Sequence, residues 1–121
     1  MCDVVLLVNG NTYPCHRAIL AAACPYFNAM FTSVMRESRE SQITLFHEPT
    51  STNAFEHLLM YLYSGKLEYR FDQAELFSLV HLADQYQLES LLALGAAALL
   101  SVNRSIIYYL KTYFMENKHP I

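Results

Sequence analysis

The Asn9-Gly10 pair constrains the fold of this chain more than any other feature. It lies between two runs typical of β-strands, "DVVLLV" and "NTYPC", and Asn-Gly readily adopts the positive φ angles that a tight hairpin turn requires. Segment 3–15 is therefore predicted to form two short antiparallel strands. Pro14 cannot donate a ladder hydrogen bond, so it places the second strand at a sheet edge or marks the end of that strand.

Helical patterns follow this hairpin. The run "HRAILAAA" is rich in Ala and Leu, which favour helix. Pro25 suits the first turn of a second helix, with Cys24 at its cap position. In this second helix apolar residues recur three, four, seven and eight positions apart. They are Phe27, Met30, Phe31, Val34 and Met35.

The two ends of this apolar stripe have different expected roles. Phe27, Met30 and Phe31 are expected in the core, because most apolar stripes at helical spacing are buried. Met35 lies beside the polar run "RESRES". An adaptable thioether in that place suits either the edge of the core or the groove of a partner, and the pattern alone leaves both readings open.

Two pairs of residues with capping-box spacing predict further helices. Asn53 with Glu56 would open one helix, and Asp72 with Glu75 would open the next. Gly65 would end the first of them in a left-handed conformation. One face of that first helix is predicted to carry Phe55, Leu58, Leu59, Leu62 and Tyr63.

The rest of the chain completes the predicted fold class. "QITLF" is predicted to form a short strand. Segment 88–101 is apolar nearly all round, which predicts a helix buried inside the domain. A final helix from about 105 to 116 would bring Ile107, Leu110 and Phe114 together. A small sheet followed mostly by helices indicates an α+β fold.

Composition narrows the possible partners. A length of 121 residues suits one domain, and a formal charge of −3 with scattered basic residues gives no reason to expect nucleic acid. The longest apolar stretch, 91–100, is about half the length of ~20 residues that spans a bilayer, so no membrane is expected. Three cysteines without a recognisable secretory leader indicate reduced thiols and a cytoplasmic or nuclear location.

The sequence lacks the constellations that catalysis or metal binding require. There is no G-x-S-x-G elbow, and "YSGK" lacks the upstream glycine of a phosphate-binding loop, which leaves Lys66 as a surface turn residue. His81 and Asp84 share a helix face, but a metal site would need further ligands. Cys15-His16 and Cys24 lack C-x-x-C spacing. We therefore predict no enzyme, no metal and no cofactor.

Three segments together resemble the BTB/POZ domain family, in its kelch-like and speckle-type adaptor branch. They are "CDVVLLVNGNTYPCHRAILAAACPYFNAMFTSVMRES", "AFEHLLMYLYSGKL" and "LVHLADQYQLESL". The resemblance runs from Cys2 to about Leu92. It implies a BTB/POZ core over residues 1–102. Residues 103–121 would then form a C-terminal helix that extends the domain or leads into a following one.

What the resemblance implies is a protein–protein interaction module that is usually dimeric. Many family members are substrate adaptors of cullin-3 ubiquitin ligases, in which a hydrophobic residue, any residue and then Glu engage the N-terminal domain of the cullin. Met35-Arg36-Glu37 fits that motif, so Met35 and Glu37 are the expected cullin-binding residues. Asp3 and Arg17 stand where an acid and a base line the charged groove at many BTB dimer interfaces, and they are expected to lie close together.

The resemblance leaves two functions open. The first is a cullin-3 adaptor, and the second is a self-associating scaffold of a transcriptional regulator that recruits corepressors without a ligase. A channel tetramerisation domain is disfavoured by the "HRAILAAA" and "PYF" signatures. The printed sequence begins at the strand holding Asp3, without the preceding helix and strand that exchange between subunits in many BTB dimers. From this a weakened homodimer is expected.

Overall fold

The N-terminal hairpin forms as predicted. The computed structural model describes residues 2–32, 40–45, 52–67 and 72–117. Strand β1 (Val4–Val8) pairs antiparallel with β2 (Asn11–Cys15). The turn between them holds Asn9 and Gly10 at φ values of 50° and 83°, in the left-handed region that this turn requires.

A third strand completes the sheet. Strand β3 (Gln42–Leu45) pairs parallel to β1, which gives the order β2-β1-β3. Strand β2 is thus an edge of the described sheet, where the missing N–H of Pro14 costs no ladder bond. The short strand predicted at "QITLF" is confirmed.

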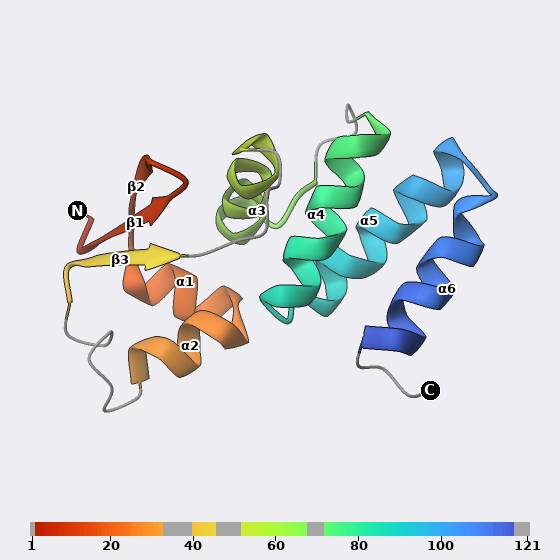
Figure 1. Ribbon diagram of the computed structural model, residues 1–121. Helices are drawn as coiled ribbons and strands as arrows, with labels where there is room; N and C mark the ends of the chain where they lie inside the picture. Colours follow the sequence, from red (N-terminus) through yellow and green to blue (C-terminus); the bar gives the residue numbers. More distant parts are fainter. Residues whose placement is uncertain (1, 33–39, 46–51, 68–71, 118–121) are drawn as a thin grey trace.

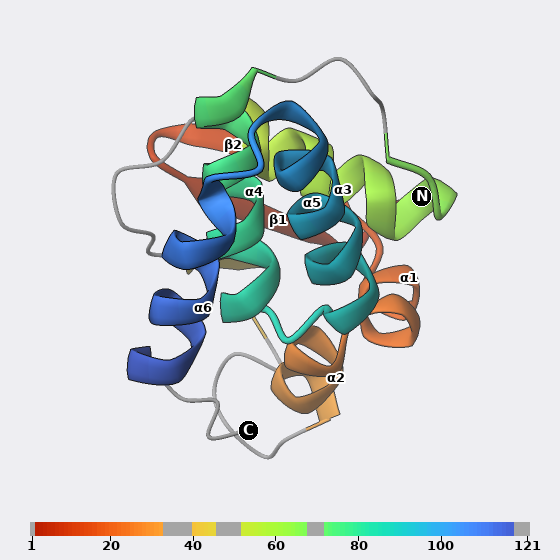
Figure 2. The same ribbon diagram turned by 90° about the vertical axis from the view of Figure 1, so that its right-hand side faces the viewer.

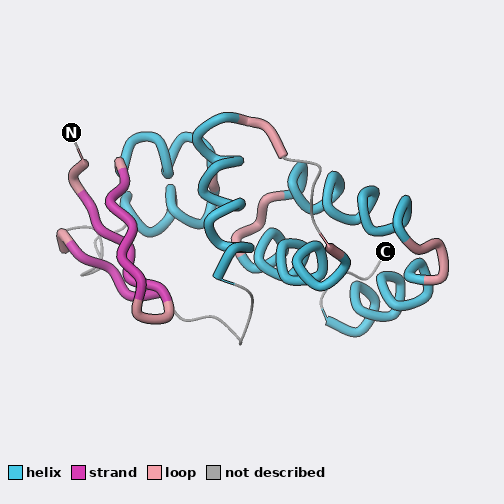
Figure 3. The backbone as a smooth tube through the Cα atoms, turned by 90° about the horizontal axis from the view of Figure 1, so that it is seen from above, coloured by secondary structure: helices cyan, strands magenta, loops and turns pink. Residues whose placement is uncertain are grey.

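Helices make up most of the described chain. They are α1 (Arg17–Ala23), α2 (Pro25–Thr32), α3 (Thr52–Ser64), α4 (Gln73–Gln85), α5 (Glu89–Val102) and α6 (Ile106–Asn117). Figure 1 shows the sheet with α1 and α2 at one end and α5 with α6 at the other, and Figure 3 shows the same order from above. The predicted α+β fold class is therefore confirmed.

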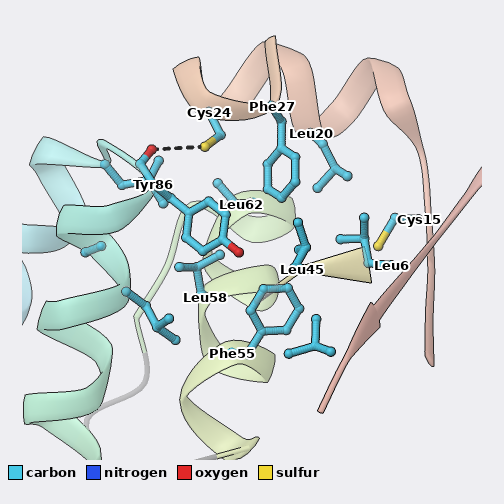
Figure 4. Close-up of a cluster of buried hydrophobic side chains, with 14 of the residues drawn as sticks. Leu6, Cys15, Leu20, Cys24, Phe27, Leu45, Phe55, Leu58, Leu62 and Tyr86 are labelled. Atoms are coloured by element: carbon cyan, nitrogen blue, oxygen red, sulfur yellow. Dashed lines mark hydrogen bonds between the residues drawn. The ribbon is translucent and has the colours of Figure 1, made fainter. Parts of the chain in front are cut away.

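The core has two parts. The larger cluster lies between the inner face of the sheet and helices α1 to α4, and Phe27, Phe55 and Tyr86 are its largest fully buried side chains. Figure 4 shows these three rings side by side. The smaller cluster joins α4, α5 and α6, which lie together at the front of Figure 2. It contains Leu76, Val80, Leu99, Ile106 and Leu110.

The predicted helix ends are correct in two cases and displaced in one. The side chain of Asp72 accepts a hydrogen bond from the backbone N–H of Glu75 at 2.8 Å, and Gly65 follows α3 with φ of 75°. Helix α3 begins at Thr52, so Asn53 lies in its first turn and is not its cap. Tyr63, on the predicted apolar face of α3, is 43% exposed.

Helix α5 is not buried all round, contrary to the prediction. Only Leu91, Gly95 and Leu99 are buried, four residues apart on one face, while Leu94 and Val102 are 46% and 58% exposed. The buried face packs closely on α4. Apolar composition therefore overstated the burial of this helix. No helix in the described ranges is both long and apolar enough to cross a membrane.

Helix α6 packs through a different face from the predicted one. Ile106 and Leu110 are buried against α4 and α5, whereas Ile107 is exposed. Ile106 and Leu110 are four positions apart, and the predicted pairing of Ile107 with Leu110 used the alternative spacing of three. The side chain of Phe114 lies outside the described residues.

Candidate functional site

Helix α2 holds the base of the predicted cullin-binding segment. Phe27 is fully buried and stacks on Tyr86, with ring centroids 5.4 Å apart. Met30 and Phe31 are partly buried and pack against the same cluster, as expected of core residues near a helix surface. Met35 and Glu37 lie in 33–39, outside the described residues, so their assignment stays a prediction.

Cys24 fixes the start of α2. Its carbonyl accepts from the backbone N–H of Asn28 at 2.9 Å, and its thiol donates to the backbone carbonyl of Tyr86 at 3.3 Å (Figure 4). Burial raises the pKa of the Cys24 thiol, against the opposing effect of nearby backbone N–H groups of the first turn. The predicted cap position of Cys24 is confirmed. Its side chain ties α2 to the C-terminal end of α4.

The N-terminus of α1 is stabilised by residues far away in sequence. His16 occupies the cap position but makes no side-chain cap hydrogen bond. The backbone N–H of Arg17 donates instead to Asp3 Oδ1 at 2.8 Å, and the backbone N–H of His16 donates to the Tyr63 hydroxyl at 2.9 Å. Asp3, just before β1, and Tyr63 of α3 thus satisfy two N–H groups that the start of the helix leaves without intrahelical partners.

Asp3 and Arg17 are close together, but their contact is not a charge pair. The carboxylate binds the backbone of Arg17, while the guanidinium donates to the backbone carbonyl of Glu40 and lies over the Phe31 ring at 5.2 Å from its centroid. An acceptor at the positive end of a helix is favourable whatever the side chain of residue 17. Their expected role at a dimer interface stays a prediction.

Tyr63 is a residue of this site whose role the sequence did not reveal. Its hydroxyl also lies 2.9 Å from Nδ1 of His16. Burial is the main cause that raises the pKa of Tyr63. A tyrosine at the rim of an apolar helix face often buries its ring and offers its hydroxyl to a neighbour. That was the one sequence signal available.

The outer face of α1 is exposed and apolar. Ile19 is 37% exposed, and three alanines of this helix are exposed around it. They are Ala18, Ala22 and Ala23. Helix α1 packs on α3, which exposes Met60 as a second large apolar side chain. Small side chains let another backbone approach closely, so this face suits helix-to-helix contact.

The remaining polar groups do not assemble a reactive centre among the residues described. His81 Nε2 lies 3.3 Å from the Tyr109 hydroxyl, across the contact between α4 and α6. Within the described ranges no three His, Cys, Asp or Glu side chains are placed to hold a metal ion. Lys66 is exposed after α3, where its backbone N–H donates to the Ser64 hydroxyl at 3.2 Å.

One open cleft of about 570 Å³ lies where α2 and α5 begin. Its lining comes from two separate chain segments and is Ala23, Pro25, Gln87, Leu88, Glu89 and Ser90. Glu89 is the single charged side chain among them, so no acid–base pair for catalysis is present there. Sequence inspection missed this cleft because its two walls are more than sixty residues apart.

Comparison with known proteins identifies the family. The model of the BTB/POZ domain matches residues 1–103. The chain belongs to the BTB/POZ domain family. It is 38% identical over 89 residues to human Kelch-like protein 24, a match that covers 68% of this chain and 14% of that protein. It is 37% identical over 97 residues to human Kelch repeat and BTB domain-containing protein 6, covering 74% of this chain and 14% of that protein.

Further relatives and solved structures agree on the fold. Human leucine-zipper-like transcriptional regulator 1 is 44% identical over 66 residues, or 54% of this chain and 8% of that protein. The BTB domain of human gigaxonin superposes with a TM-score of 0.62 and 27% identity, covering 79% of this chain and 75% of that one. The BTB domain of zebrafish PATZ1 superposes with a TM-score of 0.66 and 24% identity, covering 83% of this chain and 76% of that one. This BTB domain is thus a protein-interaction module that spans a small part of its curated relatives.

Proposed function

We propose that this BTB domain belongs to a substrate adaptor that recruits a cullin-3 ubiquitin ligase and self-associates. The observation that carries this proposal is Met35-Arg36-Glu37, which fits the motif by which many family members engage the cullin. Two relatives whose names include kelch support it, because kelch repeats would supply a separate substrate-binding domain. A reduced, cytoplasmic or nuclear protein is part of the same proposal.

The anchoring of α2 supports a binding role for the segment that follows it. The stacking of Phe27 on Tyr86 and the hydrogen bond of Cys24 fix this helix on the core. Because α2 is held in place, the chain up to Thr32 loses little conformational entropy when a partner binds beside it. Apolar contact by Met35 and a charge at Glu37 would then combine a central anchor with a polar rim.

Calorimetric titration with the N-terminal domain of cullin-3 tests this function. Met35→Ala removes apolar contact and Glu37→Lys reverses a charge, and each should weaken binding by more than ~1 kcal/mol. Leu94→Ala, at an exposed apolar residue of α5, is the matched control and should bind like the wild type. Undiminished binding by the Met35→Ala, Glu37→Lys double variant, or no binding by the wild type, would refute the assignment.

Self-association is proposed to use the outer face of α1. The exposed alanines permit close approach of a second copy, and Ile19 and Met60 add apolar area. Ile19→Asp should shift the monomer–dimer equilibrium toward monomer in light scattering across a dilution series. Val102→Asp, at an exposed apolar residue of α5, should leave that equilibrium unchanged. The reverse pattern would place the dimer contact elsewhere.

The second candidate is a self-associating scaffold of a transcriptional regulator. The similarity to leucine-zipper-like transcriptional regulator 1 favours it. This alternative also uses a BTB dimer but needs no cullin. Dimerisation without any binding of the cullin-3 domain would therefore support the scaffold over the adaptor.

A further inference from the structure

Two of the three cysteines lie on facing chain segments at the start of the sheet. Cys15 ends β2 and is opposite Val4 in the β1–β2 register, and Cys2 precedes Val4 by two residues. The backbone N–H of Asp3 donates to the Cys15 carbonyl at 3.1 Å, so the two segments still contact each other before β1 begins. Cys2 is therefore the diagonal neighbour of Cys15.

The spacing of such neighbours is close to that of a disulfide. Diagonal residues across an antiparallel pair have Cα atoms about 7–8 Å apart, and disulfides span up to about 6.8 Å. Cys2 lies outside β1, so a small local movement of the chain is enough to close the gap. Cys2 is exposed, whereas Cys15 is buried. An oxidant in solution therefore meets Cys2 first.

The polar surroundings also place the two thiols near each other. Burial is the main cause that raises the pKa of Cys15 and of Tyr63, and a negative charge on Cys2 adds a smaller increase to both pKa values. The Tyr63 hydroxyl lies 2.9 Å from Nδ1 of His16 and accepts from the backbone N–H of that residue, which directly follows Cys15. Two thiols, a phenol and an imidazole thus gather at the N-terminal end of α1.

We propose that Cys2 and Cys15 form a reversible intramolecular disulfide when the protein meets a peroxide. The Cys2 thiol loses its proton, the thiolate attacks one peroxide oxygen, and the O–O bond breaks. The departing hydroxide takes up that proton, so a sulfenic acid and water result. The Cys15 sulfur then attacks the Cys2 sulfur, the S–O bond breaks, and the departing hydroxide takes the Cys15 proton as a second water. Two thiols are oxidised and one peroxide is reduced.

Cys24 supplies a matched control within the same chain. It is a buried thiol like Cys15, but it lies at the start of α2, where it donates to the Tyr86 carbonyl. Trypsin digestion distinguishes a disulfide between Cys2 and Cys15 from one that involves Cys24, because no Lys or Arg lies between Cys2 and Cys15. A single peptide that ends at Arg17 contains both members of the proposed pair, and Cys24 falls in the next peptide.

The test is peptide mass spectrometry of the reduced, folded protein after treatment with hydrogen peroxide. The peptide ending at Arg17 should lose about 2 Da, and dithiothreitol should reverse this loss. Cys24→Ser should retain the loss. Cys2→Ser, a change at an exposed residue, should abolish it while circular dichroism stays native.

Three results would overturn the proposal. The first is a peptide that gains about 32 Da as a sulfinic acid without any loss of 2 Da. The second is a disulfide that links two protein copies through Cys2. The third is a loss of about 2 Da that persists in Cys2→Ser. Each would show that Cys2 does not pair with Cys15 in the folded domain.

Discussion

Replacing Asp3 with Ala should lower the free energy of unfolding by about 1–2 kcal/mol. The Asp3 carboxylate accepts from the backbone N–H of Arg17 at 2.8 Å, and His16 at the cap position offers no side-chain acceptor of its own. Removal of a cap acceptor typically costs about 0.5–2 kcal/mol. A charged acceptor at a helix N-terminus lies toward the upper part of that range, reduced here by solvent exposure.

Urea unfolding followed by circular dichroism measures this cost. With a slope of about 1–3 kcal/mol per molar urea, a loss of about 1–2 kcal/mol should lower the unfolding midpoint by roughly 0.3–2 M. Asp3→Asn keeps an oxygen acceptor at the same place, so it should lose less than half as much. Because Asn is as large as Asp, Asp3→Asn shows how much of the lost stability comes from the hydrogen bond and how much from the volume of the side chain.

A double-mutant cycle separates capping from a charge pair. Because Asp3 binds the backbone of Arg17, the cost of Asp3→Ala should persist in an Arg17→Ala background, with coupling below about 0.5 kcal/mol. A surface ion pair would itself contribute less than ~1 kcal/mol. If the cost of Asp3→Ala disappears once the guanidinium is removed, the reasoning from the backbone contact is wrong.

Four further substitutions test the packing of α5 and the burial of Tyr86. Gly95→Ala should lower the free energy of unfolding by about 1–2 kcal/mol although Ala has the better helix propensity, because the new Cβ would lie 2.9 Å from Val80 Cγ2. A raised Tm would contradict this close packing. Leu99→Ala should cost about 2–5 kcal/mol and Leu94→Ala less than ~0.5 in chemical denaturation, and equal costs would mean that α5 has no single buried face. Burial raises the pKa of Tyr86 above its ordinary value of 10.0. The contribution of neutral, buried Tyr86 to the free energy of unfolding is therefore fully present below about pH 10 and declines as pH rises further. The free energy of unfolding measured from about pH 8 to 11 should show this alkaline loss of stability. Tyr86→Phe should make the loss smaller.

Short-range signals in the sequence predicted local structure correctly. Asn9-Gly10, Pro25 and the Asp72–Glu75 cap each act through partners within four residues, so one sequence window contains the whole interaction. The same holds for Gly65 after α3. The predicted helix boundaries were less accurate. Helix α3 begins at Thr52 and not after Asn53, because a window with several polar residues offers more than one possible cap position.

Burial and long-range contacts could not be read from such windows. The apolar composition of α5 is compatible with any packed face, and only the position of α4 decides that Leu99 is buried while Leu94 is exposed. The bond from the His16 backbone to Tyr63 joins residues 47 positions apart. The resemblance placed Asp3 near Arg17 correctly, but the backbone nature of that contact depends on how β1 meets α1.

The two proposed binding surfaces share one rigid support. Helices α1 and α2 pack on each other and are separated by Cys24 alone, whose thiol is bonded to the carbonyl of Tyr86. A linker of one residue leaves little freedom for one helix to move against the other. The outer face of α1 and the C-terminal end of α2 at Thr32 therefore keep a fixed relation. If the proposed twofold dimer through α1 forms, each copy carries its own Met35-Arg36-Glu37 motif, so the proposed adaptor would have two cullin-binding motifs per dimer.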